Sequence, residues 1–109
     1  MKRLLFVIAL GLAAPSAAAD LALVNGTGEP IVEIVVRPTH HGNWLPVGGT
    51  LANGARQKIS VDTEPQCSFD VRARLASGKE LVYSGVNLSE TSAVTLNRRA
   101  DGTSWVDYD

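Results

Sequence analysis

Two adjacent histidines, His40 and His41, are the side chains best suited to metal chemistry in this chain, and they lie in the stretch Thr-His-His-Gly-Asn-Trp. Neutral imidazole is the commonest metal ligand in proteins. Because neighbouring side chains of an extended chain point to opposite faces, the two rings reach one ion only where the backbone bends. A closed zinc site also needs three or four protein ligands. We therefore predict no metal site, and keep a small copper- or zinc-binding protein that uses both histidines as the alternative.

Sulfur ligands do not complete such a site. Cys67 is the only cysteine, and it shares an alternating apolar row with Phe69, which is typical of a small core residue. A single cysteine also excludes an intramolecular disulfide. Met1 is the only methionine, and it lies in a segment that we expect to be removed. The sequence therefore predicts no bound cofactor and a fold that is held together by packing alone.

Asn43 and Trp44 follow the histidines directly. An exposed tryptophan can stack on a sugar or a base, but a ring between two turn segments favours a lid that packs onto the end of a small core. We predict that Trp44 packs on the core. The segment over residues 39–49 is the most irregular part of the chain, so His40, His41, Asn43 and Trp44 form the predicted contact surface for a partner.

Two pairs of arginines could hold an anionic glycan or a lipid headgroup. Arg72 and Arg74 share one face of a predicted strand, and the pair Arg98-Arg99 follows another strand. Asp70 lies on the same face as the first pair, and Glu80 is expected opposite Arg74. These carboxylates offer partners within the protein, so the pattern favours a solvated face whose charges compensate one another.

Neither motifs nor composition indicate an enzyme. The sequence contains no Gly-x-Ser-x-Gly elbow, no zinc-protease motif and no phosphate-binding glycine loop before a helix. The chain has 10 basic and 11 acidic residues, whereas a nucleic-acid-binding protein needs a net basic face. We therefore predict a protein that is not an enzyme and does not bind nucleic acid.

The start of the chain has the pattern of a secretory signal peptide. Two basic residues precede an apolar run over residues 4–13, and small residues follow as far as Ala19. The apolar run is too short to cross a bilayer of roughly 30 Å, so we expect cleavage after Ala19 and no membrane anchor. The sequence thus predicts a signal peptide over residues 1–19, a single domain over residues 20–109, and a periplasmic or secreted location.

Short β-rich runs separated by glycine and proline turns fill the rest of the chain, and no run has a helical period. In the second run, Val32, Ile34 and Val36 share one face, which we expect to point inward. Six or seven strands at spacings near ten residues predict a small antiparallel β-sandwich of immunoglobulin-like proportions, with a small barrel as the alternative. The predicted strands cover residues 21–25, 31–37, 57–61, 67–75, a segment through 81–83, and 92–97, and the tail at 103–108 either adds an edge strand or covers one end.

One hairpin allows the register to be argued from side chains. A three-residue loop with Gly78 in the left-handed conformation places Leu81 and Tyr83 on the core face and Glu80 opposite Arg74. A two-residue loop instead turns both apolar side chains to solvent. We predict the three-residue loop, because it buries the apolar atoms and pairs the charges.

Four short motifs occur in an order that resembles a family of small secreted bacterial domains of unknown function. In that family the pattern is Asn-x-Thr-Gly, Trp, Leu-x-x-Gly and then Cys-x-aromatic-Asp-apolar-basic. This resemblance implies an exported β-domain and carries over no catalytic residues. The matching stretches here are Asn25-Gly26-Thr27-Gly28, Trp44-Leu45, Leu51-Ala52-Asn53-Gly54 and Cys67-Ser68-Phe69-Asp70-Val71-Arg72, within residues 21–97.

Members of that family often carry a second cysteine near the position of Ser89 in this chain. The resemblance implies that this cysteine pairs with the counterpart of Cys67 in relatives. The present chain then lacks a crosslink that loop-closure arguments value at about 3 kcal/mol. Cys67 is accordingly expected to be buried without a partner.

The sequence as a whole predicts an exported, non-catalytic binding or accessory module of the bacterial envelope. Its expected partner is another envelope or secreted protein, contacted through the loop over residues 39–49.

Overall fold

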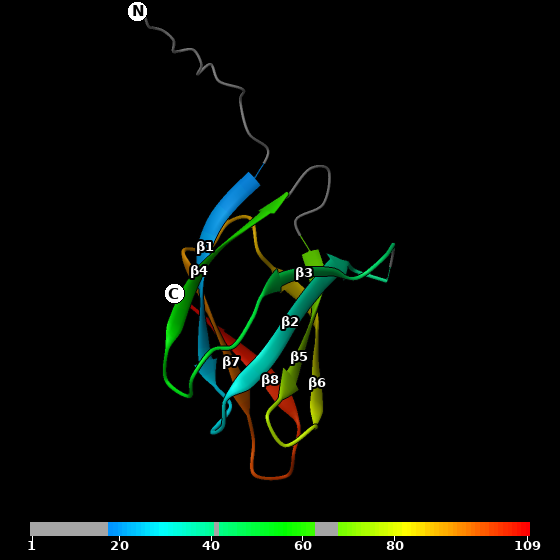
Figure 1. Ribbon diagram of the computed structural model, residues 1–109. Helices are drawn as coiled ribbons and strands as arrows, with labels where there is room; N and C mark the ends of the chain where they lie inside the picture. The colour runs from blue at the N-terminus through cyan, green and yellow to red at the C-terminus, as the bar shows by residue number, and fades with distance from the viewer. Residues whose placement is uncertain (1–17, 41, 63–67) are drawn as a thin grey trace, which may run out of the picture.

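The computed structural model describes residues 18–40, 42–62 and 68–109, and these residues fold as a β-sandwich of two four-stranded sheets (Figure 1). Residues 1–17 of the predicted signal peptide, His41 and Cys67 lie outside the described residues. Sheet 1 has the strand order β4-β1-β7-β8, and sheet 2 has the order β3-β2-β5-β6. The strands are β1 (Ala18–Gly26), β2 (Ile31–Pro38), β3 (Leu45–Gly48), β4 (Arg56–Asp62), β5 (Ser68–Leu75), β6 (Glu80–Asn87), β7 (Ala93–Arg98) and β8 (Ser104–Tyr108).

The predicted sandwich is confirmed, and two details differ from the expectation. The described residues form eight strands instead of six or seven, because β3 forms where Pro46 and the Gly48-Gly49 pair had indicated only turns. Proline is tolerated there because β3 lies at an edge of its sheet. The tail takes the first of its two predicted forms, since β8 is the edge strand beside β7.

One pair of neighbouring strands is parallel, although the sequence predicted an antiparallel sandwich. Strands β1 and β7 run in the same direction, with Leu23 beside Val94, while every other pair of neighbours in the two sheets is antiparallel. A parallel pair needs a long crossover connection. The chain supplies it, because the whole of sheet 2 is built between β1 and β7.

The core lies between the facing sides of the two sheets. Phe69, from the apolar row predicted for β5, faces the core, and the other core positions come from the rest of β5, from β1, β2, β4, β6 and β7, and from the connections. The fully buried core side chains include Leu21, Leu23, Ile31, Ile34, Val71, Leu75, Val86, Leu88, Val94 and Leu96. No helix among the described residues is long and apolar enough to span a membrane.

Strand β2 departs from its predicted alternation at its start. Val32 was expected to point inward, but its side chain is 37% exposed, whereas Ile31 is fully buried. The register against β5 shifts between Ile31 and Glu33, which inserts one extra residue at this point. Beyond the irregularity, Ile34 and Val36 face the core as predicted.

The hairpin between β5 and β6 has the predicted three-residue register. Tyr83 pairs with Val71 and Leu81 pairs with Ala73. Gly78 is left-handed, with φ of 95°. The sequence pattern was sufficient here because only one register buries both side chains of β6.

The turns between strands gather at the two ends of the sandwich. Strand β2 runs from Ile31, opposite Leu75, to Pro38, opposite Phe69. The β1–β2, β5–β6 and β7–β8 turns lie together at the end drawn at the bottom of Figure 1, which we call the three-turn end. The β2–β3 connection, which contains the predicted contact surface, lies at the opposite end of β2.

Candidate functional site

Four side chains meet on the outer face of sheet 2, and we call them the outer-face cluster: Arg37, Trp44, Asp70 and Arg72. Strands β2 and β5 provide three of them, since Arg37 pairs with Asp70 in the antiparallel register. Arg72 pairs with Val35 and therefore lies on the same face two residues further along β5. Trp44 comes from the connection that leads into β3. Local strand pairing thus fixes the charged part of the cluster, and the connection adds the ring.

Trp44 is not a core residue, which corrects the sequence-based prediction. The guanidinium carbon of Arg37 lies 4.4 Å from the centre of the Trp44 ring, and that of Arg72 lies 4.7 Å from it. Leu45, the next residue, pairs with Val36 at the edge of sheet 2, so the chain carries the ring over the outer face instead of the end of the core. Stacking against two guanidinium groups replaces the expected apolar packing.

Asp70 is the buried charge of the outer-face cluster. Its side chain is 2% exposed, although it lies on the outer side of the sheet. One carboxylate oxygen, Oδ2, accepts a hydrogen bond of 3.0 Å from Arg37 Nε and one of 3.1 Å from the amide of His40. The other oxygen, Oδ1, has no hydrogen-bond partner among the described residues. Burial by itself raises the pKa of Asp70, but the His40 amide and the Arg37 guanidinium outweigh it, so the pKa lies below its ordinary value.

The charged side chains on this face pair within the protein, as predicted, but with different partners. Asp70 pairs with Arg37 and not with the arginines of its own strand. Arg74 faces Glu80 in the register, as predicted, but its ion pair of 3.4 Å is with Glu33 on β2. Arg72 has no ion pair within the described residues, and its guanidinium stacks on the Trp44 ring. The sequence could not identify Arg37 because its role depends on which strand lies beside β5.

The predicted contact residues are only partly brought together. His40 enters the cluster through its backbone. Its φ is 58°, a left-handed conformation that is uncommon for residues other than glycine. Asn43 is exposed beside Trp44. His41 lies outside the described residues. The described residues contain no group of three or more histidine, cysteine, aspartate or glutamate side chains that could hold a metal ion.

The face around the cluster is partly apolar. A row of paired residues crosses sheet 2 from Pro46 through Val35 and Arg72 to Val82. Val35 is buried although it lies outside the core cluster, whereas Val82 is 49% exposed at the far side of the row. An aromatic ring, two cations and an exposed aliphatic side chain on one sheet face suit the binding of another molecule.

Two other motifs singled out in the sequence explain the fold and not the site. Asn25 is fully buried, and its Nδ2 donates hydrogen bonds of 2.9 Å to the carbonyl oxygens of Glu29 and Leu51. Its Oδ1 accepts hydrogen bonds from the amide and the hydroxyl of Thr27. In return, the Gly54 amide donates to the Asn25 carbonyl. The Asn-x-Thr-Gly and Leu-x-x-Gly segments are therefore the two halves of one hydrogen-bonded junction.

Comparison with known protein families and with curated proteins finds no match. A solved structure described as the NMR structure of the protein from Eubacterium rectale is similar, with a TM-score of 0.64 over 84% of this chain and 88% of that chain. The two sequences are 20% identical, so the similarity concerns the fold alone.

Proposed function

We propose that this protein is an exported, non-catalytic binding module of the bacterial envelope that contacts another envelope or secreted protein through the outer-face cluster and the adjoining loop. The observation that carries the proposal is the position of Trp44. The ring lies on the outer face of sheet 2, against two arginines, instead of filling the core. Tryptophan and arginine, together with tyrosine, are enriched among the residues that dominate binding at protein interfaces.

The cluster is arranged before any partner arrives. Arg37 is held by the buried carboxylate of Asp70, and the guanidinium in turn stacks on Trp44. An ordered ring loses less conformational freedom on binding than a mobile one, so more of the contact energy remains as affinity.

The chemistry of the surface also describes the expected partner. The charge of Arg37 is balanced by Asp70, whereas Arg72 has no ion pair among the described residues. Arg72 and the exposed side chain of Val82 are direct neighbours across β5 and β6. A partner that places an acidic side chain beside an apolar one would match both. The amino-terminal pattern supports export, because basic, apolar and small residues follow one another in the order of a signal peptide.

Photocrosslinking in the bacterium that encodes the protein tests this proposal. A photoreactive amino acid replaces Asn43, the exposed neighbour of the ring, in the otherwise native chain and in a Trp44→Ala chain. The matched control is Trp105→Ala, because Trp105 also stacks on an arginine, Arg99, at 5.3 Å, but belongs to sheet 1. We expect a discrete crosslinked protein that is lost with Trp44→Ala and retained with Trp105→Ala.

Cell fractionation of the same strains tests the location. We expect the protein in the periplasmic or extracellular fraction. A cytoplasmic location, or crosslinks that Trp44→Ala leaves unchanged, would contradict the proposal.

A further inference from the structure

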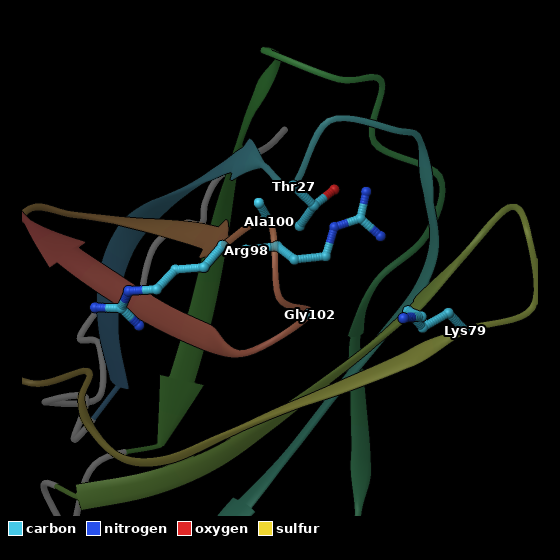
Figure 2. A pocket seen from close by; sticks show the side chains of 6 residues that line it. Thr27, Lys79, Arg98, Ala100 and Gly102 are labelled. Atoms are coloured by element: carbon cyan, nitrogen blue, oxygen red, sulfur yellow. The ribbon is translucent and has the colours of Figure 1, made fainter.

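A second feature with binding chemistry lies at the three-turn end, opposite the outer-face cluster. Here an open depression of about 290 Å³ is lined by residues of three different connections. Figure 2 shows the Arg98 side chain reaching across it, between Thr27 and the turn at Gly102, with Lys79 on the facing hairpin. The remaining lining residues are Arg99 and Ala100.

The charges around this pocket do not cancel. Arg98 Nη1 donates to Glu29 Oε2 at 3.2 Å, and Glu29 Oε1 accepts a hydrogen bond from the amide of Ser77. These bonds hold the pKa of Glu29 below its ordinary value, with the Ser77 contacts as the main cause. Glu29 thus balances Arg98 and no other cation. Among the described residues, Lys79 and Arg99 have no ion pair.

A second carboxylate, Asp101, lies close enough to Arg99 for their charges to interact, and its pKa is lowered first by the Thr103 hydrogen bonds and also by the charge of Arg99. Asp101 belongs to the β7–β8 turn, and its Oδ1 accepts hydrogen bonds of 2.9 and 2.7 Å from the amide and hydroxyl of Thr103. It does not line the pocket. Three cations, Lys79, Arg98 and Arg99, thus stand against two carboxylates, Glu29 and Asp101, and the pocket keeps a net positive charge.

The geometry favours an anion that accepts hydrogen bonds from several directions. Lys79 comes from β5–β6, while Arg98 and Arg99 come from the end of β7. Arg98 is fixed by Glu29, and its Nη2 lies over the backbone of Gly28, where an added Cβ would be only 3.5 Å away. Lysine acts as a point charge for phosphate, and arginine offers a planar fork to the same group. A tetrahedral dianion can use both at once.

We propose that this pocket binds a phosphate group, carried by a small soluble ester or by a phospholipid headgroup. The volume of about 290 Å³ accommodates the phosphate together with a small organic substituent. The site is separate from the outer-face cluster, so it gives the protein a second binding function at the opposite end of the sandwich.

An NMR titration of the purified protein with inorganic phosphate at constant ionic strength tests the site. We expect saturable shifts of the backbone amides of Lys79, Arg98, Arg99 and Gly102. The double variant Lys79→Ala/Arg99→Ala is expected to weaken binding by about tenfold or more, since it removes two charged hydrogen-bond donors from the pocket. Both side chains are exposed, so the fold should persist, and the thermal midpoint checks this.

The matched control is Arg56→Ala/Lys58→Ala, which removes the same charge from exposed positions of β4 that do not line the pocket. It should leave the affinity unchanged. If the two double variants lose the same amount of phosphate affinity, the effect arises from net charge alone and the proposal is overturned. Shifts centred elsewhere, or acetate binding as tightly as phosphate, would overturn it too.

Vesicles distinguish the two sources of the phosphate group. The protein is sedimented with vesicles of phosphatidylcholine and phosphatidylglycerol, and two results would support the proposal. Sedimentation that the Lys79→Ala/Arg99→Ala variant abolishes would identify a lipid headgroup. Phosphate binding without sedimentation would identify a soluble ester. Absence of both would overturn the proposal.

Discussion

Arg37 Nε lies 3.0 Å from Asp70 Oδ2 across β2 and β5, and this contact joins an almost fully buried carboxylate to a guanidinium that is about one-third exposed. The same oxygen accepts a hydrogen bond from the amide of His40. Asp70 Oδ2 therefore holds both the Arg37 side chain and the start of the β2–β3 connection in place. The position of Trp44 therefore depends on Asp70, through Arg37.

Asp70→Ala is expected to lower the free energy of unfolding by about 1–3 kcal/mol, because the His40 amide and Arg37 lose a charged acceptor. The matched control is Arg74→Ala, which breaks a pair whose two side chains are 48% and 44% exposed and should cost no more than about 1 kcal/mol. Urea unfolding measures both. The lowered pKa of Asp70 adds stability that is present above about pH 4 and is lost as the pH falls through the folded-state pKa. If the two variants lose similar amounts of unfolding free energy, the buried Arg37–Asp70 pair contributes no more to stability than an exposed ion pair.

Asn25 and Asn53 offer a test of the junction between the first turn and the Leu-x-x-Gly segment. Asn25→Asp replaces a buried donor of two hydrogen bonds by an oxygen that faces the carbonyls of Glu29 and Leu51. We expect a loss of about 3 kcal/mol or more, measured by chemical denaturation. Within the described residues Asn53 uses only its Oδ1, which accepts a hydrogen bond from the Gly28 amide, so Asn53→Asp should change stability by less than about 0.5 kcal/mol. A tolerated Asn25→Asp variant would contradict this account.

The regular elements could be predicted from the sequence because local patterns determine them. In β5 and β6, alternation and the glycine at position 78 define both the faces and the register. The extra residue near Val32 could not be predicted, because it appears only as a register shift against β5. Strand β3 was missed for a related reason: Pro46 is compatible with a strand only at an edge, and a sequence does not show which strands lie at edges.

The outer-face cluster shares with the predicted contact surface only Trp44 and the backbone amide of His40. The loop containing His40 and Trp44 was identified from its irregular sequence, yet Arg37 and Asp70 became part of the site only because β2 lies beside β5. Trp44 was expected in the core because large rings are usually buried, and two nearby guanidinium groups changed that outcome. The pairing of charges across strands is tertiary information, which explains why Asp70 was given the wrong partners.

Alanine substitutions at Gly78 and Gly49 distinguish the effect of backbone conformation on stability from the effect of steric crowding. An added Cβ at either position meets no atom within 4 Å, but Gly78 has φ of 95°, a region that side chains rarely adopt. We expect Gly78→Ala to cost about 1–2 kcal/mol and to lower the thermal midpoint. Gly49→Ala should be neutral or slightly stabilising, because no left-handed conformation has to be kept there. Equal effects of the two substitutions would exclude the conformational explanation.

Metal titration tests the alternative function. We expect purified protein to bind Zn(II) or Cu(II) no more tightly than micromolar, because His40 and His41 form an incomplete ligand set and the buried carboxylate of Asp70 is engaged with Arg37. Calorimetry of the protein and of the His40→Ala/His41→Ala double variant measures this, with Asn43→Ala as the control in the same loop. Tighter binding that disappears only in the double variant would establish the metal-binding alternative.

Tyr83 gives the fold a sensitivity to high pH. Its hydroxyl donates a hydrogen bond of 3.0 Å to the Asn97 carbonyl of the facing sheet, and its side chain is buried. Burial raises the pKa of Tyr83 well above its ordinary value, against a smaller opposite effect of the Arg98 charge. In the unfolded chain the phenol ionises near pH 10.

Because the folded state keeps the Tyr83 proton, this contribution to stability is complete below about pH 10 and decreases as the pH rises towards the folded-state pKa, at about 1.4 kcal/mol per pH unit. Tyr83→Phe should abolish this part of the alkaline loss, while costing about 1 kcal/mol at neutral pH for the missing hydrogen bond. Tyr108→Phe changes an exposed ring and should retain the alkaline loss. Urea unfolding of the three proteins between neutral pH and about pH 11 measures the difference, and parallel curves for the native chain and Tyr83→Phe would disprove the assignment.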